Sequence, residues 1–162
     1  MSSTTTTLPL AQRAVRAYGS AADLVDKAQS FFALALRLYV ARIFFTSGLI
    51  KLMSWSGTVG LFANEYHVPL LPPYLAAVLG TAAEISLPVL LALGLGTRLT
   101  ALALFAFNIV AATSYPDLSV AGLKDHILWG ALLLVTFVYG PGKLSLDAWL
   151  AQRFGRSEVD SI

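Results

Sequence analysis

The sequence predicts an all-α fold: a transmembrane four-helix bundle with amphipathic flanks at its N- and C-terminal ends. Of its 162 residues, 57% are apolar and only 12% are charged, and the mean hydropathy is +0.72. A soluble domain carries about 25% charged residues, so this chain has too little polar surface to cover itself in water. The apolar residues also gather in four continuous runs, each near the roughly 20 residues that a membrane helix requires.

These four runs define the expected transmembrane domain, residues 31–139. Open strands are excluded in lipid because their backbone groups would stay unpaired, and the runs are too long and too apolar for the strands of a barrel. Only Gly94–Arg98 separates the second run from the third, which predicts an antiparallel hairpin with a tight, glycine-bearing turn. The expected spans are Phe31–Met53, Tyr74–Leu95, Leu99–Tyr115 and Ala121–Tyr139.

The first flank, residues 1–30, opens with a Ser/Thr-rich leader, MSSTTTTLPL. It does not have the form of a secretory signal, because a charged segment follows in place of a short apolar core. In Ala11–Gln29, apolar and basic residues alternate at helical spacing, which suits a helix lying on the membrane surface. A partly ordered tail fits the same residues equally well.

The second flank, residues 140–162, contains a short amphipathic helix. Ser145 can cap this helix, which we expect to lie along the inner membrane surface. Its apolar side chains share one face: Leu146, Trp149, Leu150 and Phe154. The loop Ser54–Pro73 is also half apolar, and we expect it to fold back as a short interfacial helix over the opposite end of the bundle.

Basic residues are distributed unequally between the two ends of the expected bundle. Eight Lys and Arg residues fall on the side of the termini and two on the other side, with Arg42 left inside. Positive residues concentrate on the cytoplasmic side of membrane proteins. We therefore expect cytoplasmic N- and C-termini. The eight are Arg13, Arg16, Lys27, Arg37, Arg98, Lys143, Arg153 and Arg156, and the two are Lys51 and Lys124.

Three strongly polar residues fall near the middle of three different spans. Arg42 is the twelfth residue of 23, Glu84 the eleventh of 22 and Asn108 the tenth of 17. Ionised groups at bilayer depth are costly and occur mainly where they find partners in protein or water. We expect Arg42 and Glu84 to pair, with Asn108 completing the cluster. The cluster either fastens helices together or lines a pocket for a polar head group or a proton.

A second polar set is expected nearer the outer mouth of the bundle. Lys51 and His126 lie at the outer ends of their spans, so they join Arg42, Glu84 and Asn108 as candidates for ligand binding or proton relay. The loop and span-end residues beside them are candidates at the mouth: Glu65, His67, Asp125 and Trp129. No residue is singled out as catalytic.

Several chemistries are not favoured by the composition. The chain has no cysteine, which excludes intrinsic thiol and iron–sulfur chemistry. The histidines lack the ligand spacing of a metal centre, and a lone His126 is a poor indication of haem. No basic cluster of the kind used for nucleic acid is present. The expected surroundings are membrane lipid, and the glycine-bearing helix faces make a homodimer feasible.

An ordered set of short motifs resembles the DoxX family of small four-helix membrane proteins. The first is Arg42-Ile-Phe-Phe-Thr-Ser-Gly48-Leu-Ile-Lys51-Leu52, followed by Glu84 and then by Leu-Leu-Ala-Leu-Gly94-Leu-Gly-Thr97-Arg98. His126 and the sequence Gly140-Pro-Gly142-Lys-Leu144-Ser145-Leu-Asp147 complete the set. The resemblance covers roughly Leu36–Leu150 and leaves the first thirty residues outside.

The resemblance implies a plasma (inner) membrane component of an oxidoreductase system. It also implies quinone as the expected ligand and a soluble redox protein as the expected partner, since the chain holds no redox-active side chains. Whether the chain itself catalyses a reaction stays open. Two other hypotheses use the same residues: a carrier for a small solute or proton, and a membrane scaffold or assembly factor without chemistry.

Overall fold

Six α-helices and no strand make up the part of the chain that the computed structural model describes, residues 10–154. They are α1 (Leu10–Met53), α2 (Trp55–Asn64), α3 (Pro73–Leu93), α4 (Thr97–Ser114), α5 (Val120–Tyr139) and α6 (Leu146–Phe154). The leader at residues 1–9 and the tail at 155–162 lie outside the described residues. The expected all-α class is confirmed.

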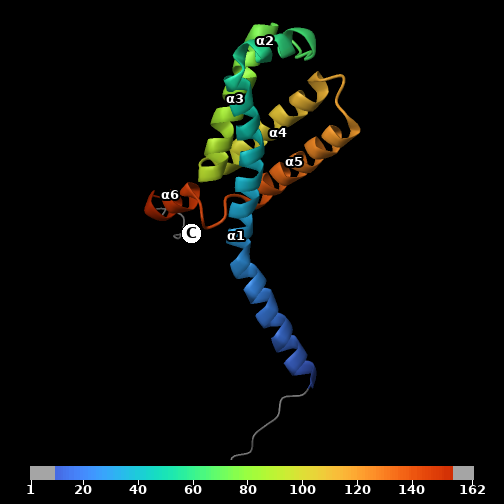
Figure 1. Ribbon diagram of the computed structural model, residues 1–162. Helices are drawn as coiled ribbons and strands as arrows, with labels where there is room; N and C mark the ends of the chain where they lie inside the picture. Colours follow the sequence, from blue (N-terminus) through green and yellow to red (C-terminus); the bar gives the residue numbers. More distant parts are fainter. Residues whose placement is uncertain (1–9, 155–162) are drawn as a thin grey trace, which may run out of the picture.

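Four of these helices are long and apolar enough to cross a membrane: α3, α4, α5 and the part of α1 from Tyr18 to Met53. Helices α3, α4 and α5 agree with the predicted spans to within two residues at each end. Figure 1 shows them with α1 as a bundle, in which α1 packs along α3 and α4 packs along α5. Residues 10–154 therefore form a four-helix transmembrane bundle with two shorter helices at its ends.

The first transmembrane helix differs most from the prediction, because it begins at Leu10 and not at the expected Phe31. α1 is continuous over 44 residues, and its N-terminal part extends beyond the other helices (Figure 1). No proline or turn sequence interrupts it before Ser54. The boundary expected between residues 30 and 31 therefore falls inside one helix.

Short turns close the two ends of the bundle. At one end, Ser54 separates α1 from α2, and the Thr58 hydroxyl donates to the carbonyl of Lys51 at 2.9 Å. At the other end, α3 and α4 are joined by Gly94 and Gly96, both with positive φ, as the predicted tight turn requires. We call these the α2 end and the α6 end.

The short helices also form where the sequence predicts them. α2 packs Phe62 against Ala76 and Ala77 of α3, so it covers the α2 end of the bundle. At the α6 end, the Ser145 hydroxyl accepts a hydrogen bond from the Ala148 amide at 3.1 Å and caps α6. Both expected helices are confirmed.

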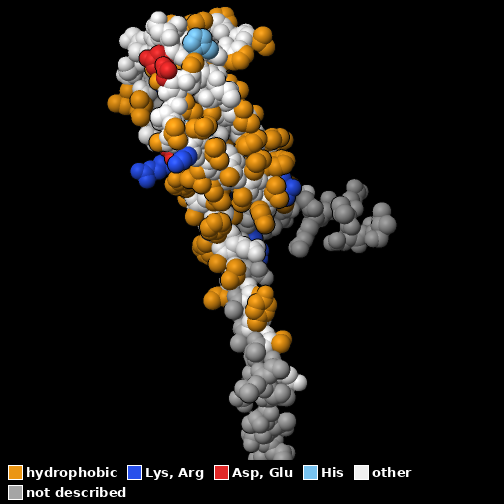
Figure 2. Space-filling model, turned by 90° about the vertical axis from the view of Figure 1, so that its right-hand side faces the viewer, with side chains coloured by type: hydrophobic (Ala, Val, Ile, Leu, Met, Phe, Trp, Pro, Cys, Tyr) orange, Lys and Arg blue, Asp and Glu red, His pale blue; other side chains and the backbone are white. Residues whose placement is uncertain are grey.

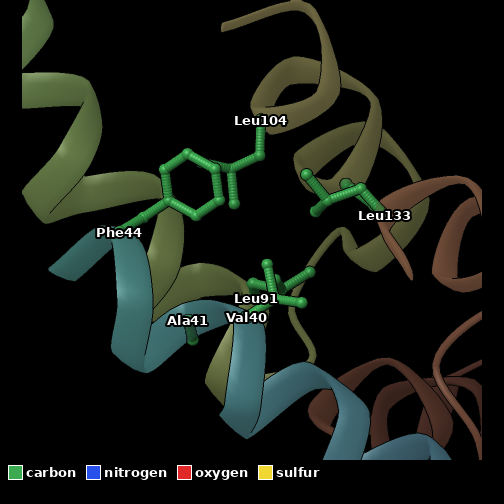
Figure 3. Close-up of a cluster of buried hydrophobic side chains, with 7 residues drawn as sticks. Val40, Ala41, Phe44, Leu91, Leu104 and Leu133 are labelled. Atoms are coloured by element: carbon green, nitrogen blue, oxygen red, sulfur yellow. The ribbon is translucent and has the colours of Figure 1, made fainter. Parts of the chain in front are cut away.

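The main hydrophobic core joins all four spans near the α6 half of the bundle. Figure 3 shows Phe44 from α1, Leu91 from α3, Leu104 from α4 and Leu133 from α5 converging there. These side chains are almost fully buried. The polar residues are thereby separated into groups on either side of an apolar centre.

Candidate functional site

Glu84 lies near the middle of α3 and pairs with Lys51, close to the end of α1. The Lys51 ammonium lies 2.7 Å from Glu84 Oε1 and 2.6 Å from Oε2, so it contacts both carboxylate oxygens. Both side chains are shielded, with 14% of Lys51 and 7% of Glu84 exposed. A carboxylate at bilayer depth needs such a partner. Lys51 supplies it.

Ser47 completes this arrangement one helical turn from Lys51. The Lys51 ammonium donates to Ser47 Oγ at 2.9 Å, and the Ser47 hydroxyl donates to Glu84 Oε1 at 3.2 Å. The three N–H groups of the ammonium therefore have three acceptors. We call Ser47, Lys51 and Glu84 the Lys51 network.

The network can form because α1 and α3 approach closely at Gly48. A Cβ at residue 48 would lie 2.9 Å from Glu84 Cβ and 2.9 Å from Ile85 Cδ1, closer than carbon atoms pack. A small residue at such a crossing lets two membrane helices touch. The absence of a side chain at Gly48 thus brings Glu84 within reach of α1.

The predicted pairing of Glu84 with Arg42 is wrong. Arg42 is exposed, whereas Lys51 is turned inward. Nine residues separate them, which is two and a half helical turns, so the two side chains point to opposite sides of α1. Counting residues along the expected span did not identify the partner of Glu84, because a residue count does not give the direction of a side chain.

An apolar pocket of about 280 Å³ lies beside the Lys51 network, between α3 and α4. Lys51 and Glu84 are its only charged lining residues. Phe62 of α2 and the segment 66–71 cover it from the α2 end. We call it the α3–α4 pocket. Its walls are Phe62, Tyr66, Val68, Leu71, Ala76, Leu79, Gly80, Ala83, Phe107, Val110, Ala111 and Ser114.

A second hollow, of about 290 Å³, lies on the other side of Lys51, between α1 and α2. Lys51 and Tyr66 line both spaces. The Lys51 ammonium therefore stands between an apolar pocket in the bundle and a more open hollow beneath α2.

Ser114 brings an unsatisfied polar group to the α3–α4 pocket. Its side chain is 1% exposed, and its hydroxyl has no hydrogen-bond partner among the described residues. Its carbonyl accepts from the His67 amide at 2.7 Å, which ties the covering loop to α4. Because a buried hydroxyl without a partner is unfavourable, a ligand with a polar atom would be stabilised there.

Three aromatic rings stack at the α2 end, and two of them, Phe62 and Tyr66, line the pocket. Tyr66 lies between Phe62, at 4.8 Å between ring centroids, and Tyr115, at 5.1 Å. Burial, and next the charge of Glu84, raise the pKa of Tyr66. The Tyr115 hydroxyl donates to Glu65 at 3.2 Å, and this bond raises the pKa of Tyr115. Both phenols therefore stay protonated at neutral pH.

Asn108 and His126 form a separate pair between α4 and α5. The Asn108 amide nitrogen donates to the backbone carbonyl of His126 at 2.9 Å, which turns Asn108 Oδ1 towards His126 Nδ1 at 2.8 Å. The carbonyl fixes the orientation of the amide, so Nδ1 carries the proton. Asn108 does not contact Glu84, and the expected single cluster is therefore two sites.

The residues expected at the outer mouth are likewise divided. Glu65 and His67 lie on the loop that covers the α3–α4 pocket, with exposed side chains. Asp125 and Trp129 are on α5 with His126, whose ring packs edge-on against Trp129 at 5.0 Å. Within residues 10–154, no three histidine or acidic side chains gather as a metal site would require.

Arg37 is the buried arginine that the sequence analysis did not single out. Its side chain is fully buried, and its guanidinium donates to the carbonyls of Leu91, at 3.3 Å, and Leu144. It thus joins α1 to the end of α3 and to the chain leading into α6. The sequence offers little indication of this role, apart from the position of Arg37 five residues before Arg42 in the same apolar run.

Asp147 makes a comparable connection from α6 to the beginning of α4. Its carboxylate accepts from the amides of Gly96, at 2.7 Å, and Thr97, at 2.8 Å, and so caps the N-terminus of that helix. Burial by itself raises the pKa of Asp147, but the bonds from Thr97 and Gly96 and the charge of Arg37 outweigh it. The net effect is a pKa below the usual value.

Four apolar membrane-length helices, with charged and polar pairs held between them, define a multi-pass membrane protein. The sequence profile of the DoxX family matches residues 32–116, just over half of the chain. The chain belongs to the DoxX family. Searches of curated proteins and of solved structures return no match.

Proposed function

We propose that this protein is an inner-membrane component of an oxidoreductase system and binds a quinone in the α3–α4 pocket. The observation that carries the proposal is the Lys51 network at the edge of an otherwise apolar pocket. Ligand sites of this kind combine apolar walls with a few polar groups that fix the orientation of the ligand. The family's association with oxidoreductase systems supports the same class of ligand.

The polar groups suit a ring with two carbonyl oxygens. The Lys51 ammonium donates to one carbonyl when it turns from Ser47, and the Ser114 hydroxyl is free to donate to another. Glu84 holds the ammonium in place through both carboxylate oxygens. Reduction of a quinone consumes two electrons and two protons. The electrons come from a soluble partner protein, and the protons reach the carbonyl oxygens through Lys51 and the hollow beneath α2.

The basic residues support a definite placement in the membrane. We propose cytoplasmic termini, as the excess of Lys and Arg on the α6 side favours, with the α2 end facing outward. A reporter fused to the C-terminus, active only in the cytoplasm, and one inserted after Asn64 test this orientation.

Quinone retention tests the proposed ligand. Purified protein is extracted with organic solvent and the extract is analysed for quinone by mass spectrometry. We expect quinone in the wild type, and less than a tenth of that amount in Lys51→Met and in Ala83→Trp, which fills the pocket. Arg42→Gln is the matched control, since it removes an exposed cation from the same helix. Equal retention in Ala83→Trp would disprove the pocket assignment.

A scaffold without chemistry is the second candidate, because the Lys51 network joins α1 to α3 where Gly48 lets them touch. Exchanging the charges, Lys51→Glu with Glu84→Lys, separates the two functions. A scaffold keeps its assembly when the pair is reversed, whereas a quinone site loses its oriented donor. The carrier hypothesis gains no comparable support, because the apolar core lies between the network and the α6 end.

A further inference from the structure

A groove lies at the α6 end, away from the proposed quinone pocket. It measures about 690 Å³ and runs between α1 and α5. We call it the α1–α5 groove. Its walls include Phe32 and Leu36 from α1 and Val135 and Tyr139 from α5, of which Phe32 and Tyr139 are strongly exposed. It is therefore open towards the surroundings of the bundle.

The loop between α5 and α6 closes one end of this groove. A Cβ at Gly142 would lie 3.0 Å from Ala33 Cβ, so the loop rests directly on α1. The amide of Lys143 donates to Ser30 Oγ at 3.4 Å beside this contact. The groove thus has apolar walls along the helices and a polar edge at the loop.

One cation lines that polar edge and a second lies close to it. Lys143 lines the groove with an exposed side chain. Arg98 does not line the groove, but its guanidinium borders the lining residue Gly140, where a Cβ would lie 3.2 Å from Arg98 Nε. Neither cation has an ion pair among the side chains that the structure describes. The carboxylate of Asp147 is engaged by the amides of Gly96 and Thr97. The two cations are therefore available to an anionic group.

The polar and apolar parts of the groove follow one another in the same order as the phosphate and the acyl chains of a lipid. Lys143 adjoins Leu144, whose carbonyl binds Arg37 where α3 ends, so the cations lie at the boundary of the spans. Leu36 and Val135 lie further into the bundle. A lipid likewise has its phosphate at the boundary and its acyl chains in the interior. Basic pockets between membrane helices are known to hold anionic lipid head groups.

We propose that the α1–α5 groove binds one anionic phospholipid. The phosphate contacts Lys143 and Arg98, and one acyl chain lies between α1 and α5. The flanks of the bundle are largely apolar (Figure 2), so any lipid can cover them. This groove combines apolar walls with Lys143 in its lining and Arg98 beside Gly140. This proposal does not depend on quinone binding at the α2 end.

Native mass spectrometry tests the proposal on the full chain. Protein in a neutral detergent is mixed with phosphatidylglycerol or with phosphatidylcholine at equal concentration. We expect one phosphatidylglycerol to remain bound at collision energies that remove phosphatidylcholine. Glycerol phosphate, which has the head group without acyl chains, should not displace the bound lipid. Equal retention of the two lipids, or displacement by glycerol phosphate, would overturn the assignment.

Two variants separate the charges from the groove. Arg98→Gln with Lys143→Gln should weaken phosphatidylglycerol binding at least tenfold, as expected when two phosphate contacts are lost. Val135→Trp keeps both cations and fills the groove, and it should weaken binding to a similar degree. Arg42→Gln, on the opposite face of α1, should bind like the wild type. If either test variant retains the lipid as the wild type does, the proposed site is wrong.

Discussion

The guanidinium of Arg37 occupies the space that any side chain at residue 94 would need. A Cβ at Gly94 would overlap Arg37 Nη1 and would come within 2.6 Å of Ser145 Cβ. Gly94 also has a φ of +68°, which favours glycine. Helix α1, the end of α3 and the approach to α6 therefore meet at a single point around Arg37.

Arg37 and Arg42 should respond differently to the same substitution. Arg37→Met leaves the buried carbonyls of Leu91 and Leu144 without their donor, and we expect it to cost about 2 kcal/mol or more. Arg42→Met removes an exposed charge without a buried partner and should leave stability within about 0.5 kcal/mol. Unfolding in mixed detergent measures both. Equal effects would contradict the assignment of Arg37 as the structural arginine.

Gly48 and Gly60 form a second matched pair. Gly48→Ala places a methyl group against Glu84 and Ile85, so α1 and α3 must separate. We expect a loss of about 1–3 kcal/mol, as for other overpacked sites. A Cβ at Gly60 of α2 meets no atom within 4 Å, and Gly60→Ala should be neutral or stabilise by up to about 1 kcal/mol. The same unfolding assay compares them, and a harmless Gly48→Ala would refute the close contact.

The coupling between Lys51 and Glu84 can be measured with a double-mutant cycle. Lys51→Met alone leaves a buried carboxylate without its partner, and Glu84→Gln alone leaves a buried ammonium. Each should cost roughly 3 kcal/mol, whereas the double variant should cost much less than the sum. Thermal unfolding of the four proteins gives the coupling energy. Additive effects would show that the two charges do not stabilise one another.

Stability should fall at low pH through Asp147. Because its pKa is lower in the folded protein than the ordinary value of 3.8 for an aspartate, the carboxylate stabilises the fold above that value. This contribution is present at neutral pH and is lost as the pH falls below 3.8 towards the folded pKa. Asp147→Asn should reduce stability at pH 7, and the difference between the two proteins should narrow as the pH falls below 3.8. Detergent unfolding midpoints from pH 3 to 7 measure this convergence, and parallel curves would contradict it.

The spans were predictable because their signal is the composition of whole segments. The hairpin turn at Gly94–Gly96 and the cap at Ser145 were predictable as well, since each depends on local residue chemistry. The pairing of Glu84 was not. Counting residues along a span gives depth, but the partner depends on helix rotation and on which helices touch. The close contact between α1 and α3 depends on Gly48. A single glycine in an apolar run does not indicate which helix it will contact.

The position of Arg42 illustrates the same limit. Its span was counted from Phe31, but α1 extends from Leu10 and the other helices end near the level of Arg37. Arg42 lies five residues from that level, about 7.5 Å along the helix. A side chain of this length can reach the polar boundary from there. The apparent midplane charge therefore does not require an interior partner.

The cap on α4 also has a consequence for biosynthesis. The amides of Gly96 and Thr97 bind a carboxylate that lies 51 and 50 residues later in the chain. When the hairpin of α3 and α4 first enters the membrane, Asp147 has not yet left the ribosome, and these amides bind water instead. The hairpin can therefore reach its final position only after α5 has inserted and α6 has returned to the bundle. A chain truncated before residue 147 would stop at this intermediate stage.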